Sequence, residues 1–136
     1  MLLATKGKTV IENNYFNSTG CAILFECDGS NWFESGSVQD VVIRNNTFDD
    51  CAYCNWGNDA ICVAPRKKEA EGKYYHGKIE VSGNRFITGG KTILYANNVR
   101  EVIVQENQSD DDTPGAVVVH HVAECSVQED IPCRVE

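Results

Sequence analysis

The sequence predicts an all-β fold, a right-handed parallel β-helix built as a solenoid of about four coils with inserted loops. Three observations predict this fold. A segment with an anchor asparagine recurs four times, a short apolar strand follows each recurrence, and the extra residues between recurrences fall in turns. We expect residues 1–136 to form a single β-helix domain that is a fragment of a longer β-helix.

The first strand of each coil is predicted by the pattern apolar-x-x-Asn-x-Phe. The pattern occurs in four segments, with Ser109 replacing Phe in the last: Val10–Phe16, Val42–Phe48, Glu80–Phe86 and Ile103–Ser109. Asn tolerates the left-handed backbone conformation that a repeated corner needs, and its amide can bond to the Asn one coil away. We therefore expect an internal ladder and a stack of phenylalanines in the core, formed by Asn14, Asn46, Asn84 and Asn107 and by Phe16, Phe48 and Phe86.

A second apolar strand follows each anchor, and these strands begin at Ala22, Ala60, Thr92 and Ala116. The shortest of the three spacings between successive anchor asparagines corresponds to one coil without an insertion. The two longer spacings contain roughly nine and roughly fifteen extra residues. These insertions lie in Asp28–Gln39, Cys51–Asp59 and Pro65–Lys78. The strands are short, rich in β-branched residues and bounded by Asn, Gly and Asp, so no long amphipathic helix competes with them.

Composition and charge exclude several classes of partner. The net charge is −8 and there is no basic stripe, which argues against binding nucleic acid. No run approaches the roughly 20 apolar residues of a membrane span, so we expect no membrane contact. The apolar run at the start of the sequence is too short for a secretory signal, because polar residues follow it at once. We expect the parent protein to be periplasmic, cell-surface or secreted, with its signal upstream of this segment. Unpaired edges at both coil ends, with no capping helix, predict self-association through those ends.

Seven cysteines are present, an odd number. Cys51 and Cys54 form a CxxC, but no second pair or histidine follows at zinc-finger spacing, so we expect no metal site. Cys21 and Cys62 stand beside apolar strand residues and are expected to behave as small buried hydrophobes. A disulfide involving Cys125 and Cys133 stays open for an oxidising compartment.

The candidate site lies in the inserted loops. If strand geometry persists, Glu26 and Asp28 share one face roughly 6.5–7 Å apart, which suits the acid and base of an inverting glycosidase. The alternative is a pair of solvated carboxylates where a strand opens into a loop. Trp32 and Trp56 present flat faces suited to stacking on a sugar ring, or else they fill the gap between loop and helix body. Asn55 could add a polar contact beside Trp56.

These stretches resemble the bacterial exo-α-1,3-galactosidases of glycoside hydrolase family 110. The resemblance covers roughly residues 2–107 and is carried above all by Glu26-x-Asp28, by Trp32-Phe33-Glu34-Ser35-Gly36 and by Asn55-Trp56-Gly57. It implies a right-handed parallel β-helix that removes terminal α-1,3-galactose with inversion, using neither metal nor organic cofactor. It also implies that the substrate-binding groove includes Glu26, Asp28, Trp32, Glu34 and Trp56, and that the partner is a glycan with terminal galactose.

One departure from the family pattern limits the activity expected of this chain. The family's central catalytic aspartates lie on earlier coils, in an Asp-Asp-x-x-Asn-type strand, and this chain has no such strand. The resemblance therefore implies a C-terminal segment that supplies one wall of the groove, with the catalytic residues unassigned. The alternative is a non-catalytic structural or glycan-binding β-helix module. A β-helix lyase or epimerase is disfavoured because no basic residue lies within Glu26–Gly36.

Overall fold

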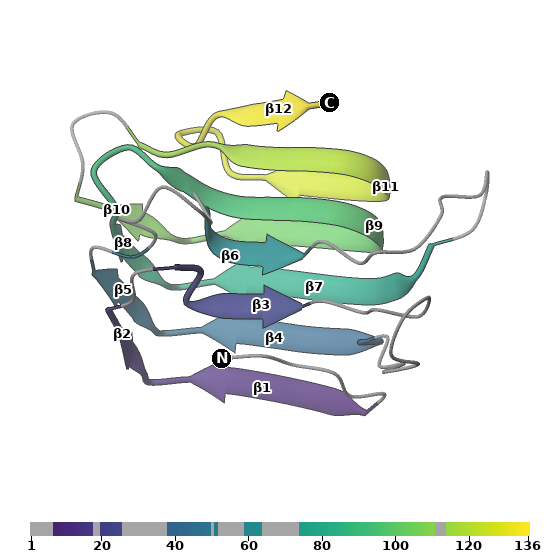
Figure 1. Cartoon of the computed structure of the whole chain (residues 1–136), viewed down its shortest axis with the longest axis horizontal. Helices are drawn as coiled ribbons and strands as arrows, with labels where there is room; N and C mark the ends of the chain where they lie inside the picture. The colour runs from purple at the N-terminus through teal and green to yellow at the C-terminus, as the bar shows by residue number, and fades with distance from the viewer. Residues whose placement is uncertain are drawn as a thin grey trace.

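The computed structural model describes residues 7–17, 20–25, 38–49, 51, 59–63, 74–110 and 114–136. Within these ranges the protein is all-β: it contains strands but no helix, and every strand pair is parallel. None of the described residues forms a helix that could cross a membrane. The strands stack one above another from β1 at one end to β12 at the other (Figure 1), an arrangement compatible with the predicted β-helix.

The described strands, in chain order, are β1 (Lys8–Glu12), β2 (Tyr15–Phe16), β3 (Ile23–Phe25), β4 (Asp40–Arg44), β5 (Thr47–Asp49), β6 (Asp59–Val63), β7 (His76–Ser82), β8 (Arg85–Ile87), β9 (Thr92–Gln105), β10 (Gln108–Ser109), β11 (Val117–Val127) and β12 (Cys133–Val135). The larger sheet runs β1-β4-β7-β9-β11-β12, and β3 and β6 join it through β9. The smaller sheet has the order β10-β8-β5-β2.

The register of the first strands confirms the repeat read from the sequence. Ile11 pairs with Ile43, Ile43 with Val81 and Val81 with Val104, as the aligned segments predict. The pairing of the second apolar strands departs from the sequence alignment by one residue at the third coil. There Ile61 pairs with Leu94, whereas the alignment predicts Ile93. Because side chains alternate between faces, the shift exchanges which residues of β9 point inward.

Two left-handed residues bend the long strands β9 and β11. Asn98 has φ 64° and His121 has φ 52°, and each divides its strand into two halves. The first half of β9 pairs with β6 and the second half with β7. Asn98 is buried, and its side-chain oxygen accepts a hydrogen bond of 2.9 Å from the backbone N–H of Tyr75. The bend at Asn98 thus lets the single strand β9 pair with two different strands, β6 and β7.

The core confirms the predicted aromatic stack. Phe16 and Phe48 stack with ring centroids 5.0 Å apart, and Phe48 and Phe86 with centroids 4.9 Å apart. Phe48 and Phe86 are fully buried, while Phe16, at the β1 end of the stack, is partly buried. Aliphatic side chains from the larger sheet fill the rest of the interior.

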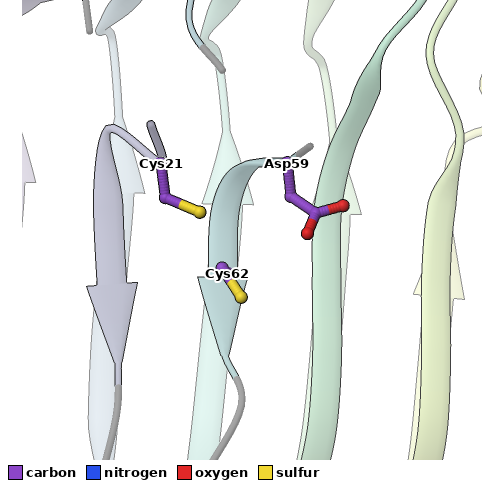
Figure 2. A group of neighbouring side chains, drawn as sticks. All are labelled: Cys21, Asp59 and Cys62. Atoms are coloured by element: carbon purple, nitrogen blue, oxygen red, sulfur yellow. The ribbon is translucent and has the colours of Figure 1, made fainter. Parts of the chain in front are cut away.

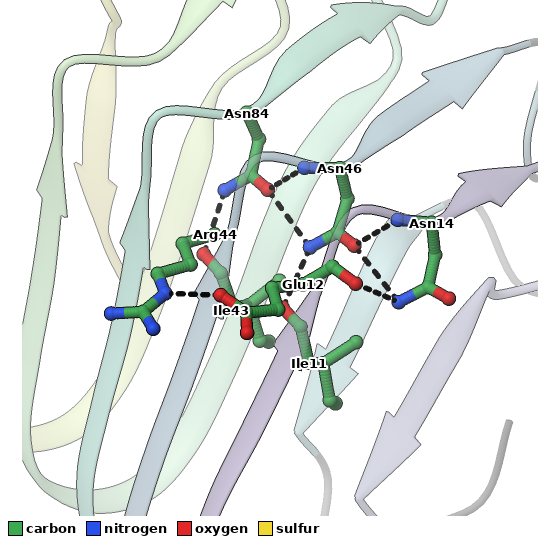
Figure 3. Close-up of polar contacts among 7 residues, drawn as sticks. All are labelled: Ile11, Glu12, Asn14, Ile43, Arg44, Asn46 and Asn84. Atoms are coloured by element: carbon green, nitrogen blue, oxygen red, sulfur yellow. Dashed lines mark hydrogen bonds and ion pairs between the residues drawn. The ribbon is translucent and has the colours of Figure 1, made fainter.

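The asparagine ladder is also confirmed (Figure 3). The side-chain oxygen of Asn46 accepts hydrogen bonds from the backbone N–H and the side-chain amide of Asn14, at 3.0 and 3.1 Å. Asn84 accepts the same two bonds from Asn46, and Asn107 accepts them from Asn84. The three inner asparagines also donate to buried backbone carbonyls, those of Ile11, Ile43 and Val81.

The left-handed residue at each corner is not the anchor, contrary to the sequence prediction. Positive φ falls on the residue before each anchor: Asn13 (60°), Asn45 (54°), Gly83 (64°) and Glu106 (57°). The left-handed residue turns the chain, and the next residue can then aim its side chain inward along the stack. Only the anchor residue has to supply a side-chain amide to the ladder. The residue before it can therefore be Gly or Glu, as at Gly83 and Glu106.

Candidate functional site

The six residues predicted to line the groove lie outside the described residues. They fall in 26–37 and 52–58, the segments of Glu26, Asp28, Trp32, Glu34, Asn55 and Trp56. The predicted site and its carboxylate separation therefore stay predictions.

The strands that flank these segments are described, and they are well packed. Segment 26–37 follows Phe25, the last residue of β3, and segment 52–58 precedes Asp59, the first residue of β6. Phe25 and Val63 are register partners and both are fully buried. Because β3 and β6 are parallel, the two segments join opposite ends of one strand pair. With β6 spanning about 13 Å, their attachment points lie well apart.

The titratable groups that the structure does bring together are Cys21, Asp59 and Cys62 (Figure 2). The two sulfurs and a carboxylate oxygen lie within 4.8 Å of one another, and each residue is partly exposed. Asp59 and Cys62 come from β6, and Cys21 lies two residues before Ile23, the first residue of the neighbouring strand β3. We refer to these three residues as the Cys-Asp-Cys cluster.

Backbone register positions the Cys-Asp-Cys cluster. The N–H of Ala22 donates to the carbonyl of Ala60 at 2.8 Å, and Leu24 pairs with Cys62. Continuing this register toward the start of β3 brings Cys21 beside Asp59. The aligned strands beginning at Ala22 and Ala60 already contained this juxtaposition, so register was the signal that could have revealed the cluster. The prediction that Cys21 and Cys62 are buried hydrophobes is wrong, because both are partly exposed and sit beside a carboxylate.

The local environment shifts the pKa values of two of the three groups, Cys21 and Asp59, in opposite directions. A hydrogen bond with Cys62 lowers the pKa of the Cys21 thiol below its ordinary value. Burial raises the pKa of the Asp59 carboxyl, because desolvation penalises its charged form. The Cys-Asp-Cys cluster thus holds one thiol whose pKa lies below its ordinary value and a carboxyl group whose pKa lies above its ordinary value.

The other candidates from the sequence are less promising. Cys125 and Cys133 are exposed free thiols in the structure, and burial raises the pKa of Cys125 to about 11, which disfavours a reactive thiolate. A hollow of about 130 Å³ beside Cys125 is lined in part by Glu101 and Glu124. It is small against the roughly 300–1,000 Å³ of typical small-molecule pockets.

The adjacent histidines His120 and His121 on β11 both contact other parts of the fold. His120 Nδ1 lies 2.8 Å from the backbone oxygen of Glu136, and the ring of His121 stacks on Tyr74 with centroids 4.6 Å apart. These contacts give both histidines a structural role.

Curated proteins named alpha-1,3-galactosidase are similar to this chain. Alpha-1,3-galactosidase A of Bacteroides fragilis is 41% identical over 110 residues, which cover 78% of this chain and 18% of the relative. Alpha-1,3-galactosidase B of Bacteroides thetaiotaomicron is 38% identical over 111 residues, covering 79% of this chain and 18% of the relative. Alpha-1,3-galactosidase A of Shewanella woodyi is 34% identical over 107 residues, covering 79% and 17%.

The chain spans less than a fifth of the length of these curated relatives. No protein-family model matches it.

Proposed function

Because this chain is similar to one segment of the alpha-1,3-galactosidases, we propose that it supplies part of the glycan-binding groove of a carbohydrate-active protein that acts on terminal galactose. The observation that carries the proposal is an identity of 34% to 41% over more than three quarters of the chain. The all-parallel strands support it, since such strands form the long concave surfaces that solenoid proteins use for binding.

The architecture proposed for the segment is a right-handed parallel β-helix. Strands β1, β4, β7, β9 and β11 form one stack, and β2, β5, β8 and β10 form another. Crossovers between parallel strands of one sheet are right-handed in about 98% of cases, which favours that hand. The asparagine ladder and the phenylalanine stack would then run along the inside of the solenoid, and the inserted segments would project from it.

The groove proposed here is formed by Glu26, Asp28, Trp32, Glu34, Asn55 and Trp56. In an inverting hydrolase one carboxylic acid protonates the leaving oxygen while a second carboxylate activates water on the opposite face of the sugar. Glu26 and Asp28 have the residue types for these two roles. The buried strands β3 and β6 would hold the segments that carry the groove residues.

We propose that the isolated chain binds galactosides and that hydrolysis requires aspartates from outside it, in a parent protein that is periplasmic, cell-surface or secreted. The second candidate is a non-catalytic structural or glycan-binding module. The two readings differ in whether the parent protein hydrolyses the galactoside that this segment binds.

The test is a hydrolysis assay and a thermal shift on the same chain, with a terminal α-1,3-galactose disaccharide as ligand. We expect no turnover, together with a rise in Tm that is lost in Trp32→Ala and in Glu26→Gln. The matched control is Glu124→Gln, an exposed carboxylate far along the chain, which should keep the shift. Turnover that disappears in Glu26→Gln or Asp28→Asn would place the catalytic pair within this chain. No turnover and no shift would overturn the galactoside-binding proposal.

The ends of the strand stack support the proposal that this chain self-associates. Val135 on β12, the last strand in the order of the larger described sheet, pairs with Val119; Val119 is 3% exposed and Val135 is 82% exposed. At the other end, Val10 on β1 is 41% exposed. We expect Val135→Lys to lower the sedimentation coefficient of the chain at high concentration. If Val10→Lys has the same effect, the two ends contact each other. If neither variant changes the sedimentation profile, the ends do not associate.

A further inference from the structure

We propose that Cys21, Cys62 and Asp59 form a metal site that binds one divalent ion of borderline softness, with Zn²⁺ the ion best suited to its ligands. The site would take two sulfurs and one carboxylate oxygen from two neighbouring parallel strands. It uses none of the six proposed groove residues, although Asp59 directly follows the segment that carries Asn55 and Trp56.

The geometry of the Cys-Asp-Cys cluster is close to that of a bound ion. In tetrahedral zinc, ligand bonds of about 2.3 Å to sulfur and 2.1 Å to oxygen place the ligand atoms about 3.6–3.8 Å apart. The three ligand atoms here lie within 4.8 Å of one another. A contraction of at most about 1.2 Å, within the reach of side-chain rotation, would place the three ligand atoms at three vertices of a tetrahedron. Figure 2 shows Cys21 and Asp59 near the starts of β3 and β6, with Cys62 farther along β6.

The ligand chemistry selects among metals. Thiolates favour Zn²⁺ and other borderline or soft ions, whereas Mg²⁺ and Ca²⁺ prefer all-oxygen sites. Because each of the three residues is partly exposed, the fourth coordination position faces solvent and would hold water or an added ligand. Binding would release the two thiol protons to solvent as the sulfurs become thiolates.

The electrostatic environment of Asp59 also fits a cation. Neither ion pair seen among the described residues, Arg44–Glu12 and Arg85–Asp110, involves Asp59. Asp59 is only partly exposed, so a bound cation would stabilise a carboxylate that water solvates incompletely. The chain as a whole carries a net charge of −8, which favours cations over anions.

The consequence for the fold is a cross-link between β3 and β6. The register pairs Leu24 with Cys62, and the ion would add a bond between the same strands just before β3 begins. Chelators would remove this cross-link, whereas they do not cleave a disulfide. The ion would stabilise only the folded chain, because Cys21 lies far in sequence from Asp59 and Cys62.

The test is a titration of the reduced, chelator-treated chain with Co²⁺, followed by displacement with Zn²⁺, under anaerobic conditions. We expect one equivalent of Co²⁺ to produce a thiolate-to-cobalt charge-transfer band, and Zn²⁺ to abolish it and raise Tm. Cys21→Ala and Cys62→Ala should each weaken binding on the order of 100-fold or more, and Asp59→Asn by about tenfold. The melting temperature of each variant in chelator separates lost binding from lost folding.

Two matched controls locate the ion. The double variant Cys125→Ser/Cys133→Ser removes the other described pair of neighbouring thiols, and Cys54→Ser disrupts the CxxC; both should bind Co²⁺ as the parent chain does. The proposal is overturned if Cys21→Ala and Cys62→Ala bind with unchanged affinity, or if only Cys54→Ser loses binding. It is also overturned if the parent chain binds no metal, or if mass mapping without reductant finds a disulfide between Cys21 and Cys62.

Discussion

Replacing Asn84 by Ala is expected to lower the free energy of unfolding by about 3–5 kcal/mol. Asn84 is 1% exposed, and its side chain joins four hydrogen bonds. It accepts from the backbone N–H and the side-chain amide of Asn46. Its own amide donates to the carbonyl of Ile43 at 2.8 Å and to the side-chain oxygen of Asn107 at 3.1 Å. Alanine leaves these buried partners unsatisfied, at a cost of about 1–3 kcal/mol for each group that water cannot reach. Urea unfolding followed by circular dichroism measures the loss.

The matched control is Asn14→Ala, at the β1 end of the same ladder. Asn14 donates to the carbonyl of Glu12 and to Asn46, and the residue is exposed, so water can replace the lost bonds. We expect this variant to lose less than about 1 kcal/mol. Domains of this size have about 5–15 kcal/mol of stability, so the Asn84 variant would be strongly destabilised and the Asn14 variant would not. Equal losses at the two positions would show that burial of the ladder does not determine its contribution.

The second large effect is a loss of stability in mild acid caused by His76. His76 is 1% exposed, and burial lowers the pKa of its imidazole from 6.5 to about 4. Between those values the unfolded chain binds a proton that the folded chain does not, so stability is complete above about pH 6.5 and declines toward pH 4. The decline amounts to at most about 3 kcal/mol.

The contacts of His76 explain why it stays neutral. Its Nδ1 accepts a hydrogen bond of 3.1 Å from the backbone N–H of Val38, and its buried Nε2 has no partner among the described residues. Protonation at Nδ1 would break the bond to Val38 and place a charge in the core. The Nε2 atom has no acceptor with which to share that charge.

The variant that isolates this effect is His76→Gln, whose side-chain oxygen can accept from Val38 and cannot titrate in this range. We expect its stability to be nearly flat between pH 6.5 and 4.5, apart from the carboxylate titration common to both proteins. His120→Gln, at a partly exposed histidine, should keep the parent profile. Parallel profiles for the parent and His76→Gln would show that His76 does not cause the acid sensitivity. Urea midpoints measured at half-unit pH intervals provide the comparison.

Sequence alone determined the features that repeat along the chain. The apolar-x-x-Asn-x-Phe pattern predicted the register of the first strands, the asparagine ladder and the stack of Phe16, Phe48 and Phe86, and the structure confirms all three. The physical reason is that a stacked repeat places equivalent residues of successive segments in contact, so alignment in sequence becomes neighbourhood in space. The resemblance to the α-1,3-galactosidases rested above all on stretches of the inserted loops, and it is matched by the curated relatives.

Tertiary structure decided what the repeat does not encode. Gln128 completes the ladder by accepting from the backbone N–H of Asn107 at 2.8 Å, although no anchor asparagine marks its position. The one-residue offset in β9 and the bends at Asn98 and His121 depend on how turns of unequal length close onto the strands below. The Cys-Asp-Cys cluster is a mixed case. The aligned strands already placed Cys21 beside Asp59, but only the tertiary structure shows that both thiols are partly exposed and lie close to the carboxylate.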